Sequence, residues 1–149
     1  ETLLLTVDDE NVAERLHPID RMPELLGVQV SFVRQLSEAG VIDLRKSPAG
    51  RDLVDGHDFP LIRVCDELRH FGIGPKNLRQ YVIAATRESA MFEQALMVFA
   101  KKGGVAREAD DETRHQFDQA FQRILVLTDS VRDELVSRRV RESFKDLQG

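Results

Sequence analysis

Apolar residues recur every three or four positions along much of this chain, a spacing that predicts helices. The clearest case is the segment 31–39, where one side is apolar and the intervening residues are polar. Ser31 is a candidate N-cap, and Gly40 is a candidate left-handed helix end. The pattern predicts a short helix that buries one face and presents polar side chains on the other. The apolar positions of this stripe are Phe32, Val33, Leu36 and Ala39.

The residues before this helix predict short supporting elements. Residues 2–7 are apolar enough for an edge strand or a packed arm, and residues 9–16 predict a helix. Asp20 as a cap and Pro23 in the first turn then predict a brief helix that ends at Leu26.

Residues 43–58 are rich in Gly, Pro, Ser and Asp, with an apolar pair at Leu53 and Val54, and predict a loop or a two-stranded wing. Pro60 opens the next amphipathic helix, which a corner at 72–75 interrupts before the pattern resumes. The apolar positions on the two sides of the corner are Leu61, Ile62, Cys65, Leu68 and Phe71, then Leu78, Tyr81 and Val82. Residues 1–82 therefore predict a winged helix-turn-helix-like unit.

Residues 83–149 predict a helical extension that packs with this unit as one domain. Gly103 and Gly104 are expected to end its first helix, and the absence of Gly and Pro from 108–147 predicts one long helix of about 55 to 60 Å. A helix of that length outreaches so small a domain, so its apolar stripe predicts dimerisation through the same helix of a second chain. The predicted dimerisation residues are Phe117, Phe121, Ile124, Val131 and Leu135, with Thr128 in the remaining slot of the repeat.

Composition supports a mainly α, soluble protein. The chain has 149 residues, of which 42% are hydrophobic and only 6% aromatic, and strand-rich domains usually need more aromatic and β-branched residues. No segment is long and apolar enough to cross a membrane, and no signal peptide opens the chain, so we expect a cytoplasmic protein without a membrane partner.

Charge argues against strong DNA binding by this chain alone. The net charge is -5, and residues 21–82 carry nine basic against eight acidic side chains. Duplex binding rests largely on neutralised phosphates and usually needs a basic excess. The best candidates for phosphate contacts are Arg34 on the second helix and Arg45, Lys46 and Arg51 on the wing. The competing interpretation is a solvated surface in which these cations alternate with acids.

Residues that could carry catalysis, metal binding or ligand binding are few. The single cysteine, Cys65, lies at helical spacing among apolar residues, and no serine occupies a nucleophile elbow. The four histidines are far apart in the sequence and supply no metal constellation. We therefore expect neither an enzyme nor a cofactor or metal. A ligand pocket between the winged unit and the long helix remains open, with core packing as the alternative role of its candidate residues, Phe71, Tyr81, Met91 and Phe92.

The order of these elements resembles the MerR family of bacterial transcription regulators. VSFVRQLSEAGVI (30–42) is similar to the second helix of that family, and RKSPAGRDLVDGHDF is similar to its arginine-rich wing. LIRVCDELRHFGIGPKNLRQY is similar to its next pair of helices. More narrowly, the segment from GHDFPLIRVC to AATRES resembles the C-terminal half of the actinobacterial FtsR group, whose members carry an ordinary DNA-binding domain upstream.

The resemblance implies a regulatory and dimerisation domain with DNA contacted through an upstream domain, and RNA polymerase or another protein as a further partner. Leu36, Ser37 and Asp52 stand where DNA-binding members present Tyr and Arg. Their presence implies a second winged unit that does not bind DNA strongly by itself. Two alternatives stay open: a DNA-binding module in its own right, and a helical adaptor that docks another protein.

Overall fold

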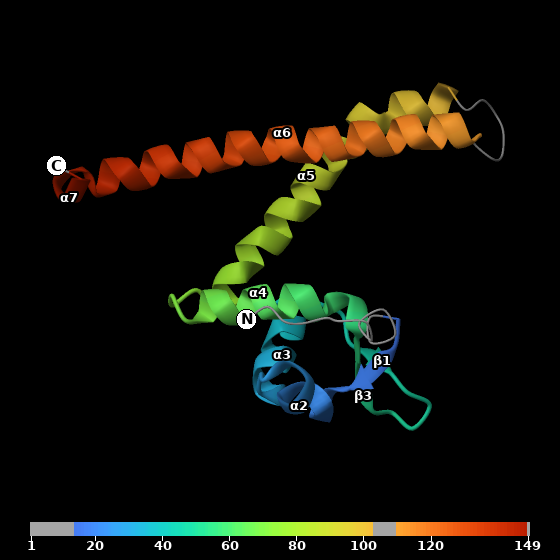
Figure 1. The fold of residues 1–149 in the computed structure, drawn as a ribbon, viewed down its shortest axis with the longest axis vertical. Helices are drawn as coiled ribbons and strands as arrows, with labels where there is room; N and C mark the ends of the chain where they lie inside the picture. Colours follow the sequence, from blue (N-terminus) through green and yellow to red (C-terminus); the bar gives the residue numbers. More distant parts are fainter. Residues whose placement is uncertain (1–13, 103–109, 149) are drawn as a thin grey trace. The chain divides into compact units, whose positions relative to one another are not determined.

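The computed structural model describes residues 14–102 and 110–148. It is mainly helical with a small sheet, and it confirms the predicted fold class: a winged unit, then a helical extension that ends in a long helix (Figure 1). The chain forms two compact units, one that ends at Ala85 and one that begins at Thr86. We call them the winged unit and the hairpin unit. Helix α5 (Pro75–Lys102) contributes residues to both.

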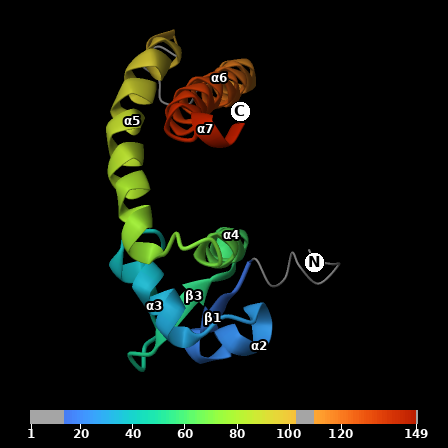
Figure 2. The same ribbon diagram turned by 90° about the vertical axis from the view of Figure 1, so that its left-hand side faces the viewer.

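The winged unit contains an antiparallel sheet with strand order β1-β3-β2. Its strands are β1 (Leu16–Pro18), β2 (Arg45–Lys46) and β3 (Asp52–Asp55). Strands β2 and β3 are the two sides of the wing predicted from sequence, and Arg45 pairs with Leu53. Strand β1 runs beside β3, with Leu16 opposite Asp55 (Figure 2).

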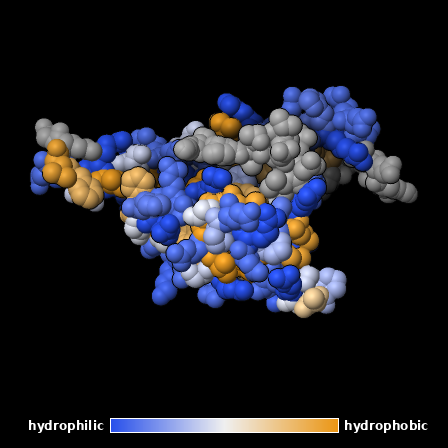
Figure 3. Space-filling view, turned by 60° about the horizontal axis from the view of Figure 1, so that its bottom comes forward, coloured by the Kyte–Doolittle hydropathy of each residue, from blue (hydrophilic) through white to orange (hydrophobic). Residues whose placement is uncertain are grey.

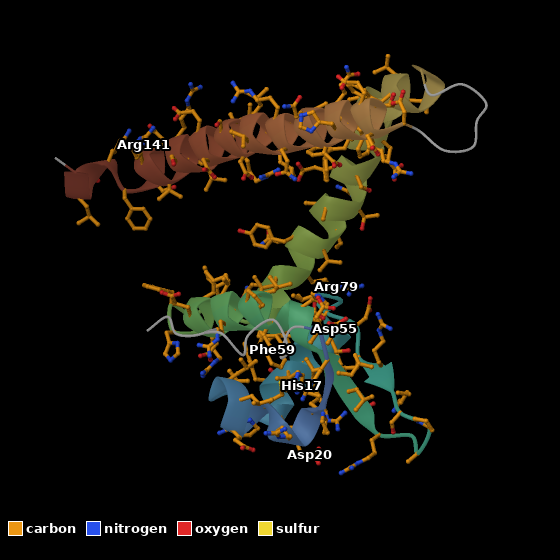
Figure 4. The ribbon with its side chains drawn as sticks, turned by 45° about the vertical axis from the view of Figure 1, so that its right-hand side comes forward. His17, Asp20, Asp55, Phe59, Arg79 and Arg141 are labelled. Carbon is orange, nitrogen blue, oxygen red and sulfur yellow. The ribbon has the colours of Figure 1, made fainter. Side chains whose placement is uncertain are left out.

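Strand β1 was not predicted. Leu16 was expected to end a helix over 9–16, yet it begins a strand, and residues 14 and 15 before it form a turn and a bend rather than a helix. Residues 9–13 of the predicted helix and the strand or arm over 2–7 lie outside the described residues. An edge strand tolerates Pro18 because a missing backbone donor there breaks no central ladder. The alternation of the strand turns Leu16 outward and buries His17, whose ring lies 5.1 Å from that of Phe59 between centroids (Figure 4).

Four helices and two 3₁₀ turns surround this sheet. The 3₁₀ turns span Ile19–Arg21 and Gly56–Asp58. The helices are α2 (Met22–Leu26), α3 (Val30–Glu38), α4 (Phe59–Arg69) and the first part of α5.

The predicted helix caps were partly wrong. Helix α3 begins at Val30 after the extended residue Gln29, so Ser31 already lies inside the helix and makes no cap. Asp20 does not cap α2 either, because the 3₁₀ turn brings the chain into α2 through Arg21. Gly40 follows α3 with φ +87°, as predicted.

Helices α3 and α4 supply most of the core of the winged unit, with three buried side chains each. The predicted α3 stripe is confirmed, since all four of its apolar residues are buried. For the helix predicted to open at Pro60 the prediction was partly wrong: Ile62 and Cys65 on α4 are buried, but Leu61 is exposed. Phe71, which follows the end of α4, is 78% exposed. Phe59 takes the inward position, because the buried face follows the spacing 59, 62, 65. The largest fully buried side chains are Met22, Leu36, Ile62, Val33 and Val54.

The hairpin unit pairs the second part of α5 with α6 (Asp111–Ser143), and α7 (Lys145–Gln148) follows. Ring contacts join Phe92 to Phe121 and Phe99 to Phe117, so the residue numbers rise along one helix as they fall along the other. The two helices are therefore antiparallel. Farther along the same seam, Arg132 forms an ion pair with Glu88.

The long helix is slightly shorter than predicted. Asp110 caps it by accepting a hydrogen bond from the backbone N–H of Thr113 at 2.7 Å. At the other end, Phe144 leaves helical geometry and separates α6 from the short α7. The predicted stop at Gly103 and Gly104 falls outside the described residues.

Candidate nucleic-acid and pairing surfaces

Each cation predicted to contact phosphates lies beside a carboxylate of the same unit. Asp52 lies at the centre, on β3: its Oδ2 is 2.5 Å from Nη1 of Arg34 and its Oδ1 is 2.6 Å from Nζ of Lys46. Helix α3 and strand β2 thus each bring one cation to the same acid. Asp52 itself is mostly covered, whereas both cations are about half exposed or more.

The other two wing cations have looser partners. Arg45 Nη2 lies 3.9 Å from Oδ2 of Asp55, and Arg51 Nη2 lies 3.4 Å from Oδ2 of Asp20. The latter pair is well exposed to solvent on both sides, and pairs of that kind contribute little to stability. Asp55 and Asp20 still supply negative charge beside Arg45 and Arg51.

Hydrogen bonds from Lys46 and then Arg34 lower the pKa of Asp52 from its ordinary value. Asp52 therefore carries its negative charge throughout the neutral range and offsets one of the two cations beside it. A phosphate that approached Arg34 or Lys46 would meet this carboxylate at contact distance. The surface has the shape of a wing and its recognition helix without their usual excess of positive charge.

A second polar cluster, which sequence reasoning missed, joins His57 to two acids. Nδ1 of His57 lies 2.8 Å from Oδ1 of Asp55, and Nε2 lies 3.3 Å from Oε1 of Glu14. Asp55 also caps the following 3₁₀ turn by accepting the backbone N–H of His57. The spacing of Asp55 and His57 is a local signal for this turn, but nothing in the sequence places Glu14 beside them.

These contacts shift the pKa values of both partners. The hydrogen bond to Asp55, and then that to Glu14, raise the pKa of His57 above its ordinary value. The backbone hydrogen bond from His57 is the main cause that lowers the pKa of Asp55. His57 is therefore protonated to a higher pH than a free imidazole.

The residues predicted to line a ligand pocket have different environments. Phe71 and Tyr81 are exposed on the winged unit, and Met91 is exposed on the hairpin unit. Phe92 is buried in the seam of the hairpin, where its ring packs edge-on against that of Phe121. Phe92 is therefore a core residue of the hairpin, which is the alternative to a role in a ligand pocket.

A cavity that the sequence did not indicate lies within the winged unit. It has a volume of about 610 Å³ and opens between the end of α3 and the start of α5. Nη1 of Arg79, a residue labelled in Figure 4, donates a hydrogen bond at 3.3 Å to the carbonyl oxygen of Ala39, and both residues line this cavity. Its lining residues are Gln35, Glu38, Ala39, Gly72, Gly74, Pro75, Lys76, Asn77 and Arg79.

The stripe predicted to drive dimerisation divides into two parts. Phe117 and Phe121 contact Phe99 and Phe92 of the same chain, so they belong to the hairpin seam. Ile124 is half-buried, and its carbonyl oxygen accepts a hydrogen bond from the hydroxyl of Thr128 at 2.8 Å. Beyond this point the stripe is open: Val131 is 61% exposed and Leu135 is 51% exposed.

The sequence matches the family described as Rv1828-like, C-terminal domain, over residues 19–144. The chain belongs to this family. It is a family associated with MerR-like regulators, and the match runs from the first 3₁₀ turn of the winged unit to the end of α6 in the hairpin unit. No curated protein matches this Rv1828-like domain.

The described part of the Rv1828-like domain has neither a cluster of metal-binding side chains nor an exposed thiol. No group of three or more His, Cys, Asp or Glu side chains able to hold a metal ion occurs among residues 14–102 and 110–148. Within the same ranges, no helix has the length and apolar character needed to span a bilayer. Cys65 is buried, and burial raises the pKa of its thiol, which disfavours the reactive thiolate.

Proposed function

We propose that this chain is the C-terminal regulatory and dimerisation domain of a MerR-like bacterial transcription regulator, and that it does not bind DNA strongly by itself. In the full-length cytoplasmic protein an upstream domain contacts DNA, and this domain acts by binding rather than by catalysis. Membership of a regulator-associated family and the winged fold support the proposal. The charge of the wing distinguishes this role from direct DNA binding.

The observation that carries the proposal is the pairing of all four candidate cations with acids of the same unit. Asp52 takes Arg34 and Lys46, and the acids at Asp20 and Asp55 take the two other wing cations. Affinity for duplex DNA comes mainly from cations that replace phosphate counterions. Asp52, Asp55 and Asp20 together offset three of these four positive charges, so the winged unit gains little by contact with DNA.

Titration of a fluorescent DNA duplex with this chain, and in parallel with the full-length protein, tests the claim. We expect the full-length protein to bind at about 150 mM salt and this chain to leave the anisotropy of the duplex unchanged. Tight binding by this chain at that salt, lost in Arg34→Ala and Arg51→Ala, would instead identify a DNA-binding module in its own right.

Dimerisation is the second part of the proposal, and the open portion of α6 supports it. The apolar stripe of α6 continues beyond the phenylalanine contacts with α5 through Val131 and Leu135, whose side chains are more than half exposed. Light scattering coupled to size-exclusion chromatography measures the oligomeric state of the chain in solution, and we expect a dimer. A monomer would contradict dimerisation and favour the alternative of a helical adaptor that docks a different protein.

A further inference from the structure

The cavity of the winged unit lies where the end of α3 meets the start of α5, two segments that are side by side in Figure 2. One of its walls is the corner between α4 and α5, which backbone hydrogen bonds hold in place. The N–H of Gly72 donates to the carbonyl oxygen of Arg69 at 3.0 Å, and Gly72 has a left-handed φ of +85°. The N–H of Ile73 donates to the carbonyl oxygen of Leu68 at 3.1 Å. This pair of bonds is the common left-handed helix ending, so the wall is formed without a ligand.

The next residue of this wall, Gly74, leaves its backbone open. Its N–H donates to Oδ1 of Asn77 at 2.9 Å, and its carbonyl oxygen accepts the N–H of Asn77 at 2.9 Å. Its φ is not left-handed, and a Cβ added to it would have no atom within 4 Å. The fold therefore has space for a side chain here. Because Gly74 has none, a bound molecule can approach the backbone closely.

Two cations that line the cavity have no acidic partner. Among the residues that the structure describes, neither Lys76 nor Arg79 forms an ion pair. Arg79 uses one N–H to bind the carbonyl oxygen of Ala39, which orients its guanidinium and leaves its other donors available. The wing cations differ, because each of them lies beside a carboxylate. The cavity therefore has the uncompensated positive groups that the wing lacks.

The α3 side of the cavity offers different chemistry. Gln35 and Glu38 are three residues apart and lie on the same face of α3. Within the described ranges Glu38 has no ion-pair partner, so its carboxylate can accept hydrogen bonds from a ligand. The side-chain amides of Gln35 and Asn77 can both donate and accept. Carboxylate and amide groups together suit hydroxyl groups, which also donate and accept.

The two kinds of wall indicate a phosphate ester that carries hydroxyl groups. A phosphate monoester has close to two negative charges at neutral pH and three strong acceptor oxygens, and the cavity presents two cations. The described lining residues include no aromatic side chain on which the base of a nucleotide could stack. The volume of about 610 Å³ lies within the range of small-molecule sites.

We propose that this cavity binds a small sugar phosphate. Arg79 and Lys76 hold the phosphate, and the side chains of Glu38, Gln35 and Asn77 bind the hydroxyl groups. The open backbone of Gly74 gives the ligand room against the corner. The use of such a ligand as a regulatory signal rests on the proposed function, whereas the binding itself does not.

Isothermal titration calorimetry of the purified chain with glucose 6-phosphate tests the site. We expect a dissociation constant below about 1 mM, and binding at least about tenfold weaker in Arg79→Gln and in Lys76→Gln. Arg63→Gln is the matched control, because it removes the same charge from α4, outside the residues that line the cavity. An equal loss of affinity in the control would show that net charge, rather than this cavity, attracts the ligand, and would overturn the proposal.

Gly74→Asp tests the position of the ligand without weakening the fold. Asp is among the preferred residues immediately before the first turn of a helix, so the urea midpoint should be maintained or raised. The added carboxylate should repel the phosphate and raise the dissociation constant at least about tenfold. Unchanged affinity in Gly74→Asp would overturn the placement of the ligand against this wall.

Three further probes separate the parts of the ligand. Glucose lacks the phosphate, inorganic phosphate lacks the sugar hydroxyls, and gluconate carries a carboxylate in place of the phosphate. Each should bind at least about tenfold more weakly than glucose 6-phosphate. Equal affinity for any of the three would overturn the assignment to a sugar phosphate. Failure of glucose 6-phosphate, ribose 5-phosphate and glycerol 3-phosphate to bind would overturn the site itself, while the duplex titration would still test the proposed function independently.

Discussion

At the residue scale, a few side chains have roles that depend on one or two contacts. Asp52 holds two cations that would otherwise face solvent, and His57 links the start of the described chain to the end of β3 through Glu14 and Asp55. Gly40 combines a left-handed backbone with close packing against α5. Each of these roles leads to a measurable consequence of one substitution.

Asp52→Asn should increase the affinity of this chain for duplex DNA at low salt. The change frees Arg34 and Lys46 for phosphate contacts, so the logarithmic dependence of affinity on salt should become steeper by about one to two. Fluorescence anisotropy across a salt series measures both quantities. Asp43→Asn, which changes the net charge equally at an exposed position of the same unit, is the control. Equal effects of the two variants would show that net charge alone matters.

His57 should make the stability of the winged unit depend on pH. Its pKa is raised in the folded state, so its stabilising contribution is fully present below the pKa of the unfolded chain and is lost as pH rises through the folded-state pKa. We expect the urea midpoint of the parent chain to exceed that of His57→Gln at about pH 5.5 and to approach it at about pH 9. A difference that grows with pH would contradict the proposed ion pairs.

Gly40→Ala should destabilise the winged unit by about 1 to 2 kcal/mol from left-handed strain alone. A Cβ at this position would also lie 3.3 Å from Cγ1 of Val82, which adds to the cost. Gly27→Ala separates the two effects, because Gly27 has φ +70° and no atom near the added Cβ. Urea denaturation should therefore show a larger loss for Gly40→Ala, and equal losses would mean that Val82 accommodates the methyl group.

At the scale of the elements, the same residue type has opposite roles according to the face it occupies. Helix α4 shows this clearly: Ile62 and Cys65 are buried, whereas Leu61 and Val64 face outward on a second apolar stripe. Helix α6 also has apolar residues with two different roles: Phe121 contacts α5, whereas Leu135 farther along the same stripe is exposed. Apolar side chains farther along, at Val140, Phe144 and Leu147, are also exposed, and Figure 3 shows hydrophobic surface at this C-terminal end.

Phe92→Ala should cost about 3 to 5 kcal/mol of hairpin stability, because it removes a ring from the seam and leaves a cavity beside Phe121. Phe71→Ala, at an exposed position, should change stability by no more than about 0.5 kcal/mol. Thermal unfolding followed by circular dichroism compares the two. Similar losses would contradict the assignment of Phe92 to the core and Phe71 to the surface.

At the scale of the whole molecule, two units carry different parts of the proposed function. The winged unit has a closed core around its sheet, and its surface cations are paired internally. The hairpin unit has a thin core, and its long helix α6 leaves apolar side chains such as Val131 and Leu135 exposed, which supports the proposed dimerisation. A regulator of this design separates self-association from the recognition of DNA.

The sequence by itself predicted the mainly helical class, the wing, the buried stripe of α3 and the long final helix, because apolar periodicity and Gly or Pro punctuation are local signals. It did not predict β1, whose pairing with β3 joins segments far apart in the chain. Nor did it show which cations have partners: Arg34 and Asp52 meet only when the wing folds against α3. Contacts between distant segments depend on the complete fold, so only the tertiary structure decided that Phe117 and Phe121 close a hairpin while Leu127 and Val131 stay exposed.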